Sequence, residues 1–528
     1  MDKKTWIVLI VFSVFLFGYQ GFLMWQKGKK PREPQKTQAA ADTLAGKSQQ
    51  VPAESLSQKP QEMKTASPAQ PETSRTTQVS SPEDSGFVVV STQSYTLRLY
   101  KIGGAIESMT LYGFKNAQRD ADSVVVIKHG SSYLATWFDY CLHYTGSDSL
   151  FKLAENDTLR LEFSGPEGAK FYTFYGTGHT FSMWLEGPDT AHMFMAPSLA
   201  ITEKDPKLDL KEHAFVYYRN DKMHREPVSK VKGPGKGTPG DGVKWFGLTG
   251  KYFMFACIVQ DGALKSLEAT TQDRSDTTMK LEAVLNKTPL SLTVYAGPID
   301  YDVLKDVGYG LEDTYNFGFW LIAPFARFIF VGFRLLYKII PNYGWVILLF
   351  SLLMKVVFSP LSFKMFKSMK KMQDLKPKMD ALQKKYKDKP EELNRAIADL
   401  YKEQKVNPLS GCFPMLLQLP IFWALYQVLR TTIDLRAAPW IFWIQDLSMK
   451  DPYYILPVVM GAVSLANGLL QPQADKQAKW TSAAMAGVFT FIFLNFPAGI
   501  VLYWLSYNIY SIGEQYIFRR MLKKPEAS

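Results

Sequence analysis

The sequence predicts a polytopic α-helical membrane protein that also carries an all-β sandwich domain and a helical hairpin outside the membrane. Three observations predict this fold class. The apolar residues of the 528-residue chain are gathered into blocks, short β-branched and aromatic runs fill residues 87–298, and a strongly basic segment at 362–410 interrupts the apolar blocks. A chain of this length normally forms more than one domain.

Residues 1–26 are expected to form an N-terminal transmembrane signal anchor. An uncharged stretch of about 20 residues follows Lys3 and Lys4, which is roughly one bilayer thickness. It is too long for a typical signal-peptide core, and no small-residue cleavage site follows it. Residues 27–85 are rich in Gln, Pro, Ser, Thr and Ala. Because such a segment buries too little apolar surface to offset its ordering entropy, we expect a disordered linker.

Residues 86–310 are predicted to form the β-sandwich. Alternating runs at 87–101, 123–129, 158–165, 180–187 and 290–297 are separated by Gly, Asp, Asn and Pro, which is typical of short strands in a sandwich. All six histidines lie in this region without metal-ligand spacing, and three cysteines are too few for a zinc site. We therefore expect no metal site and no enzyme active site here.

Residues 311–340 are predicted to form an amphipathic helix in the membrane interface. Arg327, Arg334 and Lys338 are spaced by seven and four, so they lie along one line of a helix. A single cationic stripe on an apolar helix is typical of a segment that lies in the interface instead of crossing.

Residues 342–361 are long and apolar enough to cross a bilayer, and they contain one cation, Lys355. An ionisable group inside a spanning helix costs about 2.5–3.5 kcal/mol on insertion scales. Ser351 lies one turn before Lys355 and on the same helix face. Two interpretations stay open: the face lines a polar groove, or Lys355 extends to the lipid headgroups.

The segment 362–410 carries thirteen Lys/Arg and seven Asp/Glu, which predicts a cytoplasmic location. Apolar residues at helical spacing predict a hairpin of two helices. In the first helix they are Met365, Met369, Met372, Leu375, Met379, Leu382 and Tyr386, and in the second Leu393, Ile397 and Leu400. The methionine-rich stripe is either packing between the two helices or an adaptable contact surface.

Further crossings are predicted at 413–429 and 453–470 and, because 480–513 is too long for one span, in two helices separated by a break at 495–499. With the anchor this gives six transmembrane helices, an amino terminus inside and a basic cytoplasmic tail at 519–528. The formal charge is +12, and residues from 311 onward carry 26 Lys/Arg and 15 Asp/Glu. This basicity suits anionic phospholipid or a ribosome, and no module for sequence-specific nucleic-acid recognition accompanies it.

Several motifs carry a family resemblance. They are MQDLKPKM at 372–379, KVNPLSGCFPMLLQLPIFWALY at 405–426, DPYYILPVVMG at 451–461 and FPAGIVLYWLSYNIYSI at 496–512. In this order they resemble the YidC family of membrane protein insertases, over residues 342–520. The anchor and the large domain before them resemble the Gram-negative form of the family, in which that domain is periplasmic.

The resemblance implies a five-helix insertase core at 341–518 around a hydrophilic groove that opens to the cytoplasm and to lipid. It implies a bacterial inner-membrane location, no cofactor, and as partners nascent membrane proteins, the ribosome, the Sec translocon, and the signal recognition particle with its receptor. Lys355 matches the position of the family's groove arginine, and Ser351, Tyr503 and Trp504 match other groove positions. Gln418 and Asn495 are added from polarity alone.

A translocator of an anionic lipid or solute that uses Lys355 remains the alternative function. After the Lys355 helix, the predicted spans contain no Asp, Glu or His in their interior, with Glu514 at a span end. The absence of a proton relay and of a visible inverted repeat disfavours a secondary transporter. An enzyme in the sandwich would need a convergent acid, base or nucleophile, which the sequence does not show.

Overall fold

The computed structural model describes residues 86–523, with gaps at 119, 137, 189, 197–198, 232–236, 272–278, 388, 405–412 and 473–475. The predicted anchor (1–26), the predicted linker (27–85) and the end of the tail lie outside the described residues. Residues 371–408 form part of one compact unit, and residues 74–370 together with 409–528 form another.

The β domain is built from seventeen strands. They are β1 (Phe87–Ser91), β2 (Tyr95–Tyr100), β3 (Ile106–Tyr112), β4 (Ser123–Ile127), β5 (Ser132–Thr136), β6 (His143–Tyr144), β7 (Leu150–Lys152), β8 (Thr158–Gly165), β9 (Gly168–Tyr175), β10 (Thr180–Glu186), β11 (His192–Ala196), β12 (Ala214–Arg219), β13 (Lys222–Pro227), β14 (Thr238–Pro239), β15 (Val243–Thr249), β16 (Phe253–Thr271) and β17 (Met279–Pro298). Short helices α2 (Pro206–Leu210) and α3 (Tyr301–Val307) accompany them. The all-β prediction for this region is confirmed.

All described strands belong to one hydrogen-bonded network, in which β16 and β17 pair antiparallel over most of their length and β1 and β7 pair parallel. Buried and partly exposed residues alternate along β1 and β2, as expected of strands with one packed face. The network folds over its own core: the ring of Tyr133 on β5 lies 5.0 Å from the ring of Phe255 on β16, although these strands are not paired.

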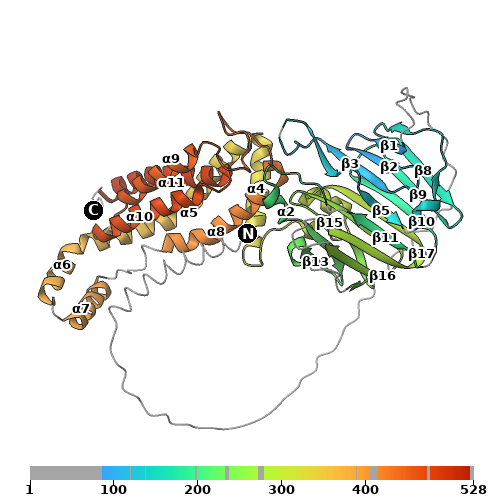
Figure 1. The fold of residues 1–528 in the computed structure, drawn as a ribbon. Coiled ribbons are helices and arrows are strands. Elements are labelled where there is room, and N and C mark those ends of the chain that lie inside the picture. Colours follow the sequence, from blue (N-terminus) through green and yellow to red (C-terminus); the bar gives the residue numbers. More distant parts are fainter. Residues whose placement is uncertain are drawn as a thin grey trace, which may run out of the picture. The chain divides into compact units, whose positions relative to one another are not determined.

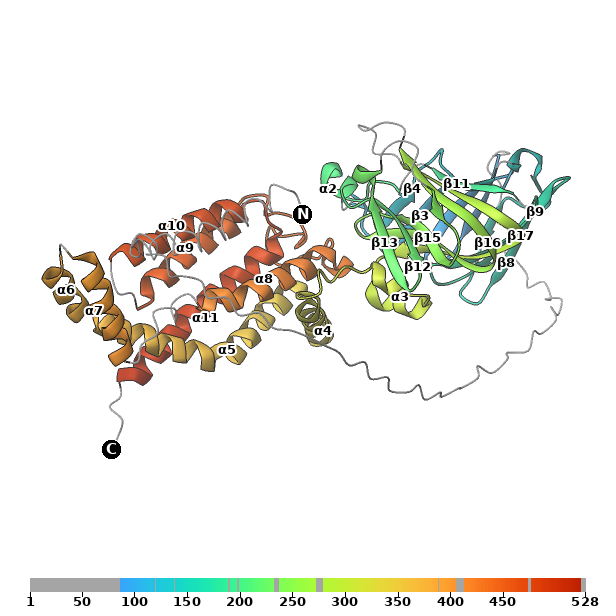
Figure 2. The same cartoon turned by 90° about the horizontal axis from the view of Figure 1, so that it is seen from below.

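Helices follow the β domain, and most of them are apolar, whereas the two in the hairpin are rich in charged residues. They are α4 (Ala323–Ile339), α5 (Tyr343–Asp374), α6 (Lys376–Lys385), α7 (Pro390–Glu403), α8 (Phe413–Thr431), α9 (Ile455–Leu470), α10 (Lys476–Phe493) and α11 (Ala498–Lys523). Figures 1 and 2 show α5, α8, α9, α10 and α11 running side by side. Within the described ranges, α5 is the one helix that is both long and apolar enough to cross a membrane, and α9 is a shorter apolar helix. The count of six spans therefore stays a prediction.

Helix α5 continues to Asp374, beyond the predicted span end at residue 361, and it contains Pro360. The prediction of a single hairpin helix carrying the whole methionine stripe is wrong. The stripe is divided between α5 and α6, with the break at Leu375. Pro377 lies in the first turn of α6 and has no backbone N–H to donate to the carbonyl four residues earlier, so the helical hydrogen bonding is interrupted here.

In the hairpin unit, Leu375 and Leu400 are buried, and Met372, Met379 and Leu382 pack against them. These members of the stripe, from the end of α5 to α6, pack with Leu400 of α7, as the packing interpretation predicts.

The β domain and the helices of the second unit share one apolar core. Val216, Trp245 and Met254 of the β domain belong to the same buried cluster as helix residues such as Ile329 and Val346. A buried ion pair reinforces the contact: Arg436, which follows α8, donates from Nε to Glu203 Oε1 at 2.6 Å. The helices and the β domain are therefore in direct contact.

Candidate functional site

Helix α5 places Ser351 and Lys355 one turn apart on its buried face. Ser351 is fully buried, and its Oγ lies 2.7 Å from the Oγ of Ser506 on α11. Hydroxyl groups of this kind link apolar helices through hydrogen bonds, and each of the two also lies within hydrogen-bonding distance of a carbonyl of its own helix, at Leu348 and Tyr503. Residues 155 positions apart in the sequence are thus joined in one polar strip between α5 and α11.

The Lys355 ammonium lies 2.7 Å from the Glu514 carboxylate on α11, and the two side chains are 10% and 11% exposed. The same Nζ lies 4.6 Å from the centroid of the Tyr507 ring. The cation is therefore held against α11 and is not extended away from the helices. One Glu514 oxygen, Oε1, is buried without a hydrogen-bond partner among the described residues.

Tyr503 and Trp504 occupy adjacent positions on α11 and have different neighbours. Tyr503 is fully buried, and Gln418 on α8 donates from Nε2 to the Tyr503 hydroxyl at 3.3 Å. The centroid of the Trp504 ring lies 5.5 Å from the ring centroids of Phe422 on α8 and Phe489 on α10. Tyr503 therefore extends the polar strip, whereas Trp504 belongs to an aromatic cluster.

The sixth predicted residue, Asn495, lies in the exposed turn between α10 and α11, eleven residues before Ser506. The structure thus positions Ser351, Lys355, Tyr503 and Gln418 along the contacts of α5, α8 and α11, with Trp504 beside them. Asn495 does not take part in these contacts.

Sequence reasoning missed Glu514, which it assigned to the end of a span. A signal was present: Tyr507 and Glu514 are seven residues apart and therefore share a helix face. It also missed a buried amide network, in which Asn467 on α9 donates to Asn508 at 2.8 Å and Gln515 donates to Asn467 at 2.6 Å. This network ties α11 to α9 beside the Lys355 pair.

Chemically, the site offers one ammonium, one carboxylate and several hydroxyl and amide groups between apolar helices. Across the described ranges, no group of three or more His, Cys, Asp and Glu is arranged to hold a metal ion. These groups can hydrogen-bond or pair electrostatically with polar groups that would otherwise lack partners in an apolar environment.

Two family models match the chain. The model described as 60Kd inner membrane protein matches residues 335–525, and the model described as YidC periplasmic domain matches residues 87–331. Together they cover the helical region and the β domain.

Similar proteins match over the same extent. The membrane protein insertase YidC of Syntrophus aciditrophicus (strain SB) is 32% identical over 554 residues, covering 98% of this chain and 100% of the relative. That of Geobacter metallireducens is 31% identical over 556 residues and covers 100% of both chains. A solved structure described as an active YidC insertase with the first transmembrane domain resolved is 19% identical, with a TM-score of 0.39, over 84% of this chain and 94% of that one.

Proposed function

The chain belongs to the YidC family of membrane protein insertases, and on this premise we propose that it inserts nascent membrane proteins through the polar strip that contains Lys355. Insertases of this family act without an enzymatic reaction. The observation that carries the proposal is the Lys355–Glu514 ion pair, which is nearly buried beside Ser351 and Ser506 among apolar helices.

The physical argument concerns the polar segment that flanks an incoming transmembrane helix. Each polar group without a partner costs several kcal/mol in the hydrocarbon core. A strip of hydroxyl, amide and charged groups offers such a segment partners partway across the membrane. A cation at this depth also attracts acidic residues, because the electrostatic attraction is stronger where the dielectric constant is low.

The proposed topology has six spans, with the amino terminus and the hairpin in the cytoplasm and the β domain in the periplasm. The basic composition of 362–410 supports the cytoplasmic location of the hairpin. Helix α4 suits the membrane interface because Phe325, Phe328, Val331 and Leu335 are exposed, while its opposite face is buried in the core.

The proposed partners are the ribosome, the Sec translocon, the signal recognition particle with its receptor, and anionic phospholipid. The hairpin supports this because its lysines are largely exposed and it packs through its own small apolar core. A positively charged surface of this kind attracts ribosomal RNA and anionic lipid headgroups through long-range electrostatics.

The test measures insertion into proteoliposomes that contain the purified full-length chain. Two clients differ only in whether the translocated segment carries acidic residues. Lys355→Ala is expected to reduce insertion of the acidic client strongly, whereas Lys355→Arg retains it because the charge is kept. Lys364→Ala, which removes an exposed lysine of the same helix, is the matched control. Wild-type insertion by Lys355→Ala would show that the cation plays no part.

A further inference from the structure

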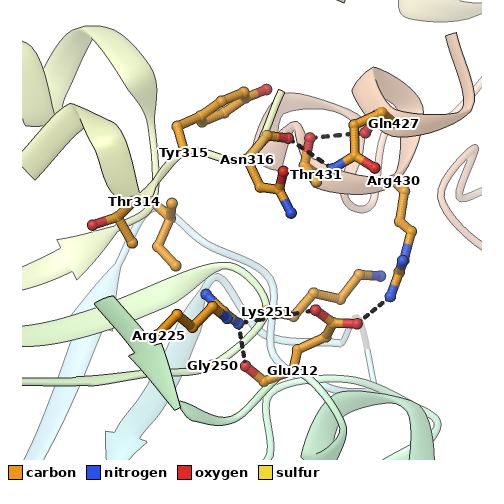
Figure 3. A pocket seen from close by; sticks show the side chains of 11 residues that line it. Glu212, Arg225, Gly250, Lys251, Thr314, Tyr315, Asn316, Gln427, Arg430 and Thr431 are labelled. Atoms are coloured by element: carbon orange, nitrogen blue, oxygen red, sulfur yellow. Dashed lines mark hydrogen bonds and ion pairs between the residues drawn. The ribbon is translucent and has the colours of Figure 1, made fainter. Parts of the chain in front are cut away.

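A small polar cavity lies between the β domain and the end of α8 (Figure 3), and Lys355 is not among its lining residues. Its volume is about 50 Å³. Since a buried water needs roughly 10–15 Å³ on this measure, the cavity has room for a few waters or for one small tetrahedral anion.

Three cationic side chains line this cavity from three separate elements. Arg225 lies on β13, Lys251 lies in the turn between β15 and β16, and Arg430 lies in the last turn of α8. Figure 3 shows the ends of these side chains converging near Glu212, the one carboxylate of the lining. The lining therefore carries a formal excess of positive charge.

The carboxylate of Glu212 is already engaged. It forms an ion pair with Arg430, and its Oε2 lies 4.0 Å from Arg225, which also donates to the Glu212 carbonyl at 2.5 Å. Lys251 makes no ion pair within the described part of the chain, and its ammonium lies 4.5 Å from the Tyr252 ring centroid. The cations outnumber the one carboxylate of the lining and are partly withdrawn from water, so this lining favours an added negative charge.

The ionisation states of Lys251 and Arg225 support this excess of positive charge. Burial alone would lower the pKa of Lys251, but Tyr252 and Glu203 more than offset it, and the pKa lies above its usual value. Burial lowers the pKa of Arg225, but guanidinium groups start so high that it stays charged at neutral pH. Both cations are therefore charged under physiological conditions.

The hydroxyl groups of the lining differ in their hydrogen bonds. Thr314 lines the cavity, and its buried Oγ1 has no hydrogen-bond partner among the described residues. A buried hydroxyl without a partner is unfavourable, and Figure 3 draws the Thr314 hydroxyl on the side away from the ends of the three cationic side chains. The other two hydroxyls of the lining have partners: Thr431 Oγ1 donates to the Gln427 carbonyl at 2.8 Å, and Tyr315 Oη lies 2.8 Å from Thr432 Oγ1.

We propose that this cavity binds a tetrahedral oxyanion of the phosphate class, either as free phosphate or as the headgroup phosphodiester of an anionic phospholipid. Guanidinium groups bind phosphate oxygens through paired hydrogen bonds, and an ammonium adds a mobile point charge. The alternative that the ligand is a lipid headgroup rests on the proposed topology. In that topology Arg430, in the last turn of the apolar helix α8, lies at the level of the lipid headgroups. The site goes beyond the insertion function and can be tested without an insertion assay.

The first experiment measures thermal unfolding of the full-length protein in a neutral detergent. Inorganic phosphate, phosphatidylglycerol and phosphatidylcholine are titrated separately. A ligand that binds the folded state raises the Tm in a saturable way. A shift with inorganic phosphate identifies free anion, and a shift with phosphatidylglycerol alone identifies a lipid headgroup. No saturable shift with either anion, or equal shifts with phosphatidylcholine and phosphatidylglycerol, would overturn the proposal.

Two variants locate the effect in the cavity. Lys251→Met is expected to weaken anion binding about tenfold, the loss expected for one charge-assisted interaction. Lys222→Met removes an exposed lysine on β13 and serves as the control, with wild-type affinity. Glu212→Gln is expected to tighten anion binding because it removes the competing carboxylate, even though it breaks the ion pair with Arg430. A purely structural role for these residues predicts no such gain. Wild-type affinity in Lys251→Met, or no gain in Glu212→Gln, would contradict the site.

Discussion

The ammonium of Lys355 on α5 and the carboxylate of Glu514 on α11 form a nearly buried ion pair with a separation of 2.7 Å. Both charges have lost most of their hydration, a cost that their mutual attraction offsets only in good geometry. Glu514 therefore acts as the resting partner of Lys355. Under the proposed function, an acidic residue of a client would have to replace this carboxylate in order to reach the cation.

This ion pair predicts that the free energy of unfolding and the insertion activity respond differently in two variants. Lys355→Ala leaves the Glu514 carboxylate buried without its partner, which is expected to cost about 3–5 kcal/mol in the free energy of unfolding. The double variant Lys355→Met/Glu514→Gln removes both charges and is expected to recover most of this loss. It should nevertheless insert acidic clients poorly, because the cation is gone. Unfolding in detergent and insertion into proteoliposomes measure the two quantities.

The single variant Glu514→Gln completes the comparison, because it keeps the Lys355 cation and removes its carboxylate partner. Insertion of acidic clients is expected to be retained or increased. Efficient insertion of acidic clients by the double variant would be incompatible with an electrostatic role of Lys355.

The second prediction concerns the buried ion pair between the β domain and the helices. The Arg436 and Glu203 side chains are 2% and 5% exposed, and Arg436 also donates to the Thr202 carbonyl at 2.8 Å. Arg436→Ala is expected to cost about 3–5 kcal/mol in the free energy of unfolding because it leaves the Glu203 carboxylate buried without its guanidinium. Limited proteolysis should then cleave between the β domain and the helices at lower protease concentration.

Lys244→Ala provides the control for this prediction, since it removes an exposed ion pair with Asp221 in the same domain. Exposed pairs contribute little because water and salt screen them. Equal protease sensitivity of the two variants would mean that the Arg436–Glu203 pair does not hold the β domain against the helices.

Much of the fold could be predicted where the sequence pattern is local. The run at 158–165 coincides with β8, and the break expected at 495–499 falls between α10 and α11. By contrast, 290–297 is only the second half of β17, which begins at Met279. Its first half includes Lys280 and Glu282, which have low strand propensity and are held in place by pairing with β16. Such tertiary pairing leaves no local signal.

Part of the site could also be predicted, where its residues are related by a local spacing. Ser351 and Lys355 share a face through a spacing of four, which the sequence shows directly. The partnership of Lys355 with Glu514 depends on how α11 packs against α5, and a carboxylate near the end of an apolar run is otherwise interpreted as a span boundary. The polarity of Asn495 gave no information on whether it faces the core or the exposed turn where the structure places it.

The third prediction concerns the hairpin. Lys384→Glu and Lys385→Glu reverse two exposed charges at the end of α6. Co-sedimentation with ribosomes is expected to weaken, more at low salt than at high salt, because screening removes long-range attraction. Reversal of two exposed lysines of the β domain, Lys222 and Lys230, should leave it unchanged. If the hairpin variant sediments with ribosomes as the wild type does, these lysines make no contribution to ribosome binding.

The last prediction concerns pH and a buried histidine of the β domain. Burial lowers the pKa of His213, and the nearby cations Arg225 and Lys128 act in the same direction, against Asp209 and Glu212. Both ring nitrogens of His213 are buried without hydrogen-bond partners among the described residues, and Nε2 lies 3.9 Å from the Asp209 carboxylate. The folded state therefore disfavours protonation of this ring.

The sign of the effect follows from proton linkage. Between the lowered folded-state pKa and the usual value of about 6.5, the unfolded state binds more protons, so stability falls as the pH falls. Burial also raises the pKa of Asp209 from its usual value of about 3.8. Between that value and the raised pKa the folded state binds more protons, so the Asp209 carboxyl increases stability as the pH falls. The test therefore compares Tm at about pH 7.5 and about pH 5.5, near the histidine window. His213→Gln should flatten this dependence, with a residual slope from His179, whose pKa burial also lowers. The exposed His143→Gln should keep the wild-type slope. An unchanged slope in His213→Gln would show that this ring is not the group that titrates.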